Sequence, residues 1–415
     1  MLYNRRRAAD YLEENDLKAL VATTTFNVAY FTDFDCWQYR DFRENMATPG
    51  ASNTLLQTYA VYVPDRDPVL VTSTGSVQFT DELRGIERRT YGGAGMELPS
   101  KRKDGGRSEP KDLSLLREAV RSAEPTPQEA LVSALEDLGV RKGRVGIEFS
   151  NLTRAARKHI EKKMDRVDWR DATELARLIR MVKTPQEVER MRASAEITEE
   201  GLKATVKAAR AGVTGGELYQ AFLGEVARRG AVPDHFIYNP LGFGISSSPR
   251  ARFRAGGNSM IDFGVIYRQY YSDTGTTVLY GPNREAEKTY GALAEIFESH
   301  VDLLKPGTTP STVLDAFGRS YRERGMKGVG YQGHGIGLQT REHPVINRTD
   351  HKTIADDVVE VGVDIPFEEG MVINIETPMD VLGVGSYQIE RTFRITGDRP
   401  EELTPRREGA PFLVA

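Results

Sequence analysis

The chain has 415 residues, of which 39% are hydrophobic and 28% are charged, and its 56 basic and 60 acidic residues give a net charge of −4. This balance is typical of a globular protein and gives no electrostatic reason to expect a nucleic acid partner. No apolar run approaches the roughly 18 residues of a membrane span, and no apolar stretch of a secretory signal follows the basic start. The single cysteine excludes an intrachain disulfide and a cysteine-based zinc cluster. We therefore expect a cytoplasmic protein without a membrane partner.

The first part of the chain alternates short β-rich runs with helical patterns, which predicts an α/β domain. The β-rich runs cover residues 19–25, 59–63 and 145–149, and the polar stretch 101–110 indicates a surface loop. A long helical pattern begins after Thr184-Pro185, where a capping residue precedes a proline at the first helical position. We place the domain boundary there, with an amino-terminal domain over 1–183 and a second domain over 184–415.

The second domain contains an internal repeat. Residues 209–222 align with 304–317, so that Gly212 meets Gly307 at an offset of 95 residues (307 minus 212). In each copy the residue pattern predicts a turn, then a helix with an N-cap, then a glycine that ends the helix. A β-rich segment follows each helix. Two units are too few for a solenoid, so we interpret the domain as two related halves with a site between them. Chance similarity of two amphipathic helices is the alternative.

Several acids lie inside β-rich runs of the second domain, where an acid faces solvent or has a partner. A chain reversal about Tyr267-Arg268 would bring Asp262 directly opposite Asp273, with β-carbons about 4.5–5.5 Å apart. Two carboxylates that close repel each other unless they share a proton or a cation. Glu376 and Glu390 lie in later β-rich runs. Each acid alone is typical of an exposed strand residue, but the set indicates a site.

A histidine, His334, lies between these acids in the sequence, inside the glycine-rich run 333–338. Four carboxylates and one imidazole form an oxygen-rich ligand set that suits a pair of divalent metals such as Mn, Fe, Co or Zn. Such a pair lowers the pKa of a bridging water and polarises a carbonyl. A structural histidine in a glycine turn is the alternative for His334.

Five residues and their settings resemble a known family, and in chain order they are Asp262, Asp273, His334, Glu376 and Glu390. With Gly-His-Gly-Ile-Gly-Leu around the histidine and Ile-Glu-Thr-Pro around the first glutamate, the chain resembles the pita-bread metallopeptidases. These include methionine aminopeptidase, aminopeptidase P and prolidase, and the non-peptidases creatinase, ectoine hydrolase and one class of dimethylsulfoniopropionate lyase. Residues 27–34 and 178–187 resemble the creatinase-type amino-terminal domain and the family's interdomain segment, so the resemblance covers nearly the whole chain.

The resemblance implies an α/β amino-terminal domain followed by an α+β pita-bread catalytic domain with internal pseudo-twofold symmetry. It also implies two divalent metal ions, with Asp262 and Asp273 on one metal and His334 on the other. Asp273 and Glu390 would be shared between both metals, and Glu376 is a candidate for a third shared ligand and for the proton acceptor.

Two histidine positions depart from the peptidases of this family, and Gln388 stands where aminopeptidase P-like members tend to have an arginine. Where they carry a second histidine seven residues after the ligand, this chain has Arg341, and the nearest counterpart of their Pro-His stretch ends in Arg250. Arginine cannot shuttle a proton as histidine does, but it can hold a carboxylate. We therefore hypothesise a small anionic or zwitterionic substrate bound by these arginines, which could instead face solvent or pair with an acid such as Glu342. His343 could replace the missing acid or base, or have a surface or packing role.

Residues 33–43 of the amino-terminal domain concentrate aromatic and charged side chains. In relatives that resemble creatinase, this region lies near the active site of the neighbouring subunit. We therefore expect a homodimer in which Trp37, Tyr39 or Arg40 caps the substrate pocket across the interface. An aromatic cluster inside its own domain is the alternative.

The resulting hypothesis is a binuclear metal-dependent hydrolase that cleaves an amide or other C–N bond in a small molecule or dipeptide. Glu376 or a nearby acid would handle the proton, and Arg341 and His343 are further catalytic candidates. A lyase, in which a base removes a proton and no water is added, is one alternative. A non-catalytic metal-binding or interaction protein is the other.

Overall fold

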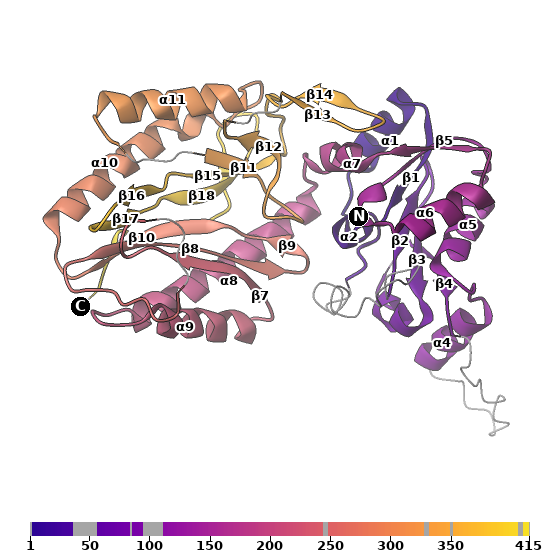
Figure 1. Cartoon of the computed structure of the whole chain (residues 1–415), viewed down its shortest axis with the longest axis horizontal. Coiled ribbons are helices and arrows are strands. Elements are labelled where there is room, and N and C mark those ends of the chain that lie inside the picture. The colour runs from indigo at the N-terminus through magenta and orange to yellow at the C-terminus, as the bar shows by residue number, and fades with distance from the viewer. Residues whose placement is uncertain are drawn as a thin grey trace. The chain divides into compact units, whose positions relative to one another are not determined.

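The structure is a computed structural model, and it describes residues 2–35, 56–83, 85–93, 111–243, 248–327, 332–348, 352–405 and 410–414. The chain forms two compact units, which Figure 1 shows with their labelled elements. Unit 1 comprises Met1–Arg180 together with Ile354–Glu360, and unit 2 comprises Met181–Thr353 together with Val361–Ala415. Across the described ranges, no helix combines the length and the apolar character needed to cross a lipid bilayer.

Unit 1 is an α/β layer around a six-stranded sheet in the order β4-β3-β2-β1-β5-β6. The two pairings that involve β2 are antiparallel and the other three are parallel. The strands are β1 (Leu17–Ala22), β2 (Tyr59–Tyr62), β3 (Val69–Ser73), β4 (Glu87–Tyr91), β5 (Gly143–Ile147) and β6 (Val167–Asp171). The α-helices are α1 (Arg5–Glu14), α2 (Thr25–Thr32), α4 (Lys111–Arg121), α5 (Pro127–Asp137), α6 (Arg154–Lys163) and α7 (Thr173–Arg180). The α/β prediction for this part of the chain is therefore confirmed.

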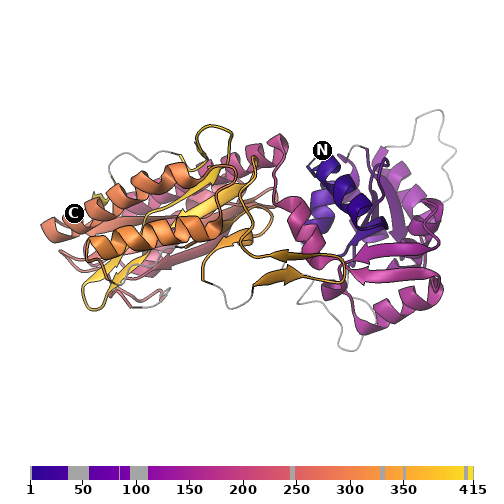
Figure 2. The same cartoon turned by 90° about the horizontal axis from the view of Figure 1, so that it is seen from above.

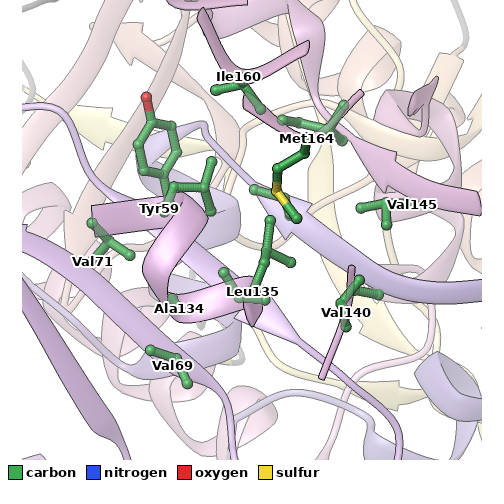
Figure 3. Close-up of a cluster of buried hydrophobic side chains, with 14 of the residues drawn as sticks. Tyr59, Val69, Val71, Ala134, Leu135, Val140, Val145, Ile160 and Met164 are labelled. Carbon is green, nitrogen blue, oxygen red and sulfur yellow. The ribbon is translucent and has the colours of Figure 1, made fainter. Parts of the chain in front are cut away.

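The core of unit 1 lies between this sheet and the helices α5 and α6. Figure 3 shows side chains of the strands, among them Val71 and Val145, gathered around Leu135 of α5 and Ile160 of α6. Each of these four side chains is at most 2% exposed. Burying a side chain of this size stabilises a fold by about 1.5–3 kcal/mol, so the cluster is a principal source of the unit's stability.

The predicted strand over residues 19–25 ends earlier than expected. β1 stops at Ala22, and Thr24 becomes the N-cap of α2. The buried carboxylate of Glu148 accepts hydrogen bonds from the backbone N–H groups of Thr23 and Thr24, at 2.7 and 3.1 Å. Because Glu148 follows β5 and is distant in sequence, a local pattern of β-branched residues could not reveal that the chain turns into a helix here.

Unit 1 also contains a short segment from much later in the chain, Ile354–Glu360. Its Asp356 accepts hydrogen bonds from the backbone N–H groups of Glu174 and Leu175, at 2.8 and 2.9 Å. These N–H groups belong to the first turn of α7, where a carboxylate satisfies unpaired donors and the helix dipole. The amino-terminal unit is thus completed by a segment that the sequence analysis assigned to the second domain.

Unit 2 is built on a twelve-stranded, mainly antiparallel sheet with the central order β12-β11-β15-β18-β10-β8-β17-β16. Its strands are β7 (Val232–Tyr238), β8 (Asn258–Tyr267), β9 (Tyr270–Tyr271), β10 (Thr274–Tyr280), β11 (Gln332–Gly335), β12 (Glu342–Ile346), β15 (Val372–Glu376), β16 (Met379–Val381), β17 (Gly385–Tyr387), β18 (Glu390–Arg394), β19 (Glu401–Glu402) and β20 (Phe412–Val414). The strands β13 (Thr353–Ala355) and β14 (Glu360–Gly362) pair separately. Its α-helices are α8 (Pro185–Ala208), α9 (Gly215–Arg228), α10 (Arg284–His300) and α11 (Pro310–Glu323).

The helices of unit 2 form two pairs. Figure 1 shows α8 and α9 below the strands and α10 and α11 above them, and Figure 2 shows α10 and α11 side by side from above. α8 begins as the sequence predicts. Thr184 is its N-cap, Pro185 is its first residue, and Thr184 and Glu187 form a capping box. The repeat is also present, since α9 and α11 follow Gly212 and Gly307, whose φ angles are 83° and 84°. Only glycine adopts this left-handed conformation readily, which explains the glycine in both copies.

Candidate metal centre

Three carboxylates lie in one row across the sheet of unit 2. Asp262 on β8 pairs with Gly275 on β10, which pairs with Glu390 on β18, which pairs with Glu376 on β15. Single oxygens of the three acids lie within 4.8 Å of one another. A β-carbon at Gly275 would lie 2.7 Å from both the Glu390 carboxylate and the Gln388 side chain, so a glycine is needed for these two groups to fit there.

The neighbouring row adds Asp273 and His334. His334 on β11 pairs with Asn374 on β15, which pairs with Thr392 on β18. The side chains of Asn374 and Thr392 donate hydrogen bonds to the backbone carbonyl of Asp273, at 2.8 and 3.2 Å. The Nε2 atom of His334 lies 3.5 Å from Oδ2 of Asp273, while its Nδ1 atom lies 3.0 Å from the carbonyl of Gly335. A ring that donates from Nδ1 to this carbonyl keeps the Nε2 lone pair directed at the acids.

The predicted register of the two aspartates is wrong by two residues. Asp262 is opposite Gly275 rather than Asp273. The chain reverses at Arg268 and Gln269, whose φ angles of 45° and 73° are both positive. Two positive φ angles are typical of the two-residue turn that matches the twist of a β-hairpin. Because side chains alternate along a strand, a shift of two keeps both aspartates on the same face of the sheet.

Burial and mutual repulsion shift the pKa values of the residues in this cluster strongly. Burial, followed by the charges of Asp262, Asp273 and Glu376, raises the pKa of Glu390 well above its usual range. Burial also raises the pKa of Asp262. Burial lowers the pKa of His334, which favours the neutral imidazole that a metal requires. Without a cation, therefore, such a set of acids cannot carry all its negative charges at neutral pH.

A second histidine, which the sequence analysis missed, lies against the two aspartates. His235 on β7 has its Nε2 atom 2.9 Å from Oδ1 of Asp262 and 3.3 Å from Oδ1 of Asp273. Burial opposes its charged form, but hydrogen bonds with Asp234, Asp262 and Asp273 raise the pKa of His235. The signal in the sequence was weak, because His235 belongs to no recognisable motif. Only its place on a strand that precedes the aspartate strand could have indicated it.

The residues proposed to bind substrate lie at the edge of this cluster or away from it. Nη2 of Arg341 lies 3.4 Å from Oε1 of Glu376, and the Arg341 side chain is 56% exposed. His343 is half-buried on β12, and Arg250 is exposed beyond the end of β7. In the described parts of the chain, no hydrogen bond or ion pair joins Arg250 to the acids.

The other candidates of the sequence analysis lie outside the described residues. These are Trp37, Tyr39 and Arg40 of the expected pocket cap, together with the polar stretch 101–110. Glu342, a suggested partner of Arg341, forms an ion pair with Lys183 instead, at 2.8 Å and almost without exposure.

The donor set fits divalent metal ions. It combines carboxylate oxygens with imidazole nitrogens, which suits Mn, Fe, Co and Zn. Burial, and then the neighbouring negative charges that a metal would neutralise, raise the pKa of Glu390. Gly275, which has no side chain, leaves room for the Glu390 carboxylate and for the Gln388 amide that donates to it.

Comparison with known proteins decides the family. The model of "Metallopeptidase family M24" matches residues 189–397, which is half of the chain, and that of "Creatinase/Prolidase N-terminal domain" matches residues 5–182. The chain belongs to metallopeptidase family M24. As a member of this family it is a metal-dependent hydrolase that uses divalent metal, and the resemblance inferred from the five donor residues is confirmed at the level of the family.

Similar proteins of the M24 family support the same fold. An uncharacterized peptidase of Staphylococcus aureus (strain bovine RF122 / ET3-1) is 28% identical over 62% of this chain and 72% of its own length. The prolidase of Pyrococcus horikoshii OT3 has a TM-score of 0.70 at 20% identity, over 97% of this chain and 98% of its own. The X-Pro aminopeptidase of Thermotoga maritima MSB8 has a TM-score of 0.71 at 19% identity, over 99% of both chains. The creatinase-type domain followed by a pita-bread catalytic domain is thus confirmed.

Proposed function

We propose that this M24 protein is a binuclear hydrolase that cleaves an amide or other C–N bond in a small anionic or zwitterionic substrate. The main support is the row in which Asp262, Glu390 and Glu376 face one another across three paired strands. Cations that neutralise the charges would stabilise so many carboxylates in a buried space. A dipeptide with a free carboxylate is the peptide form of such a substrate.

The proposed ligands divide into two groups around Asp273. Its Oδ2 atom faces Nε2 of His334 at 3.5 Å, and its Oδ1 atom faces the side of Asp262. We assign Asp262 and Asp273 to one metal and His334 to the other, with Asp273, Glu390 and Glu376 between them. When bound, a pair of divalent metals would lower the pKa of a water and polarise the scissile carbonyl.

The residues around this pair would handle protons and charge. In the proposed reaction, Glu376 accepts a proton from the attacking water and returns it to the leaving nitrogen. Arg341 touches Glu376 through one long contact of 3.4 Å, so most of its guanidinium N–H groups remain for a substrate carboxylate. His343 stays a candidate for a second acid or base on the same edge of the sheet.

Metal analysis tests the first half of the proposal. Protein purified without chelator, and then titrated with Mn²⁺, Co²⁺ and Zn²⁺, is expected to bind two ions per chain. A chain that retains and takes up no divalent ion would refute the hydrolase proposal.

A substrate panel tests the second half. The solved relatives include a prolidase and an X-Pro aminopeptidase, so Xaa-Pro dipeptides come first, followed by creatine, ectoine and dimethylsulfoniopropionate. We expect metal-dependent cleavage of a C–N bond with uptake of water. Cleavage of dimethylsulfoniopropionate without uptake of water would instead identify a lyase.

A further inference from the structure

Among the residues that the structure describes, His235 is the imidazole at this cluster to which neither the donor motif nor the proposed function gives a role. It enters from β7, next to the strand that carries Asp262. One donor atom each of His235, Asp262 and Asp273 lies within 4.8 Å of the other two. The three therefore form a compact donor group of their own on the side of Asp273 that faces away from His334.

The neighbourhood holds the His235 ring in a defined orientation. Its Nδ1 atom lies 2.9 Å from Oδ2 of Asp234, and the same oxygen accepts a hydrogen bond from the Thr340 hydroxyl at 3.0 Å. On the other side, a β-carbon at Gly264 would lie 2.9 Å from the ring, so only glycine admits the ring there. A histidine that donates from one nitrogen to a carboxylate and offers the other to the site has the arrangement usual for metal-bound histidines.

The distances match those between neighbouring ligands of one metal. Nε2 of His235 is 2.9 Å from the Asp262 oxygen and 3.3 Å from the Asp273 oxygen. Metal–ligand bonds of about 2.0–2.2 Å put adjacent ligand atoms about 3.0–3.5 Å apart in octahedral or tetrahedral geometry. The three atoms could thus surround one ion without a change of register.

We propose that His235 is a nitrogen ligand of the metal held by Asp262 and Asp273. The inference rests on the metal site of the proposed function. Each metal then has one imidazole, His235 on one side and His334 on the other, with one oxygen of Asp273 directed to each. Because imidazole suits Co, Zn and Fe better than Mn, the first site prefers these ions more than a site made of carboxylates alone.

Cobalt titration of the full-length chain tests this inference. Absorption of bound Co²⁺ and calorimetry report affinity and stoichiometry for His235→Gln and His235→Ala, without any need for a substrate. We expect one of the two ions to bind at least about 100-fold more weakly, with a changed Co²⁺ spectrum, and a smaller loss for Mn²⁺. Asp234→Asn, which removes only the orienting carboxylate, is expected to cost about 10–100-fold.

The controls separate this inference from the proposed function. His300→Gln, in a histidine hydrogen-bonded to the carbonyl of Ile296 on α10, should leave both affinities unchanged. Asp262→Asn should lose one metal. If the His235 variants keep both affinities and the spectrum while Asp262→Asn loses a metal, His235 is only a hydrogen-bond donor and the inference is wrong. If the unmodified chain binds no metal, both the inference and the proposed function fail.

Discussion

The donor cluster buries its charged side chains, whereas the edge of the cluster exposes its charged side chain to solvent. The side chains of Asp273 and Glu376 are each 7% exposed, whereas that of Arg341 is 56% exposed. A buried charge costs free energy unless a partner neutralises it, and an exposed charge costs little. Stability and substrate binding are therefore separable here: changes in the cluster should alter metal binding and stability together, and changes at the edge should alter substrate binding alone.

The largest effect is expected from Glu390→Gln, which removes a charge from the centre of the row. Metal affinity should fall by more than the roughly 100-fold typical of outer-shell changes. The metal-free protein should become more stable, because burial and three neighbouring carboxylates raise the pKa of Glu390. Metal content and thermal unfolding, with and without chelator, measure both effects. Equal destabilisation of the metal-bound and the metal-free protein would contradict the expectation that Glu390 destabilises the metal-free cluster.

The next effect concerns a buried pair outside the cluster. Lys183→Met leaves Glu342 buried without its cation, and breaking a buried pair in this way costs about 3–5 kcal/mol. Urea unfolding measures this loss. The double variant with Glu342→Gln should recover most of it, since a neutral amide can still accept from the backbone N–H groups of Leu338 and Gln339.

An exposed pair provides the matched control for Lys183. The side chains of Arg210 and Glu217 are 60% and 47% exposed at a contact of 3.0 Å. Arg210→Met should cost less than about 1 kcal/mol. Equal costs for the two variants would mean that burial does not determine the value of a charge in this fold.

A pH-dependent effect is expected from Glu187. Burial raises its pKa to about 7 from the model-compound value of 4.5. The folded chain therefore binds this proton more tightly than the unfolded chain, so stability falls as the pH rises from about 4.5 to 7. Above that pH the cost is complete, at roughly 3 kcal/mol.

Glu187→Gln should remove this pH dependence. The amide can still accept from the backbone N–H of Thr184 and meet the Tyr270 hydroxyl. Unfolding curves at pH 5 and pH 8 should give a gain in stability over the unmodified chain that is larger at pH 8. The same gain at both pH values would show that Glu187 does not titrate in this range.

The smallest effect on stability is expected at the edge of the cluster. Arg341→Ala should change the free energy of unfolding by less than about 0.5 kcal/mol, because the side chain is exposed. The KM of an anionic substrate should rise by about 10-fold or more, since a charge-assisted hydrogen bond contributes about 1.5–3 kcal/mol. An unchanged KM would remove Arg341 from the substrate site.

The sequence could predict the features that depend on local chemistry. The start of α8 follows from Thr184, Pro185 and Glu187, and the repeat follows from two glycines with matching positive φ angles. Asp262 and Asp273 were expected on one face of a hairpin, and this holds although the turn lies at Arg268-Gln269, one residue later than predicted. Period-two alternation fixes the face, whereas the exact turn depends on backbone angles that the residue types do not determine.

Features that depend on contacts between residues far apart in the chain could not be predicted from the sequence. His235 reaches the cluster only because β7 pairs with β8 across a β-bulge next to it. The buried Glu148, which follows β5, accepts a hydrogen bond from the backbone just after β1. Lys183 forms the ion pair with Glu342 that was suggested for Arg341. In each case the partner is chosen by tertiary packing, which no local pattern records.

The segment Ile354–Glu360 has a consequence for the order in which the chain is made. α7 ends at Arg180, but Asp356, which caps its first turn, leaves the ribosome 176 residues later (356 minus 180). At about 5–20 residues per second, this delay is roughly 9 to 35 s. The amino-terminal unit therefore cannot reach its final state until most of the catalytic unit has been synthesised.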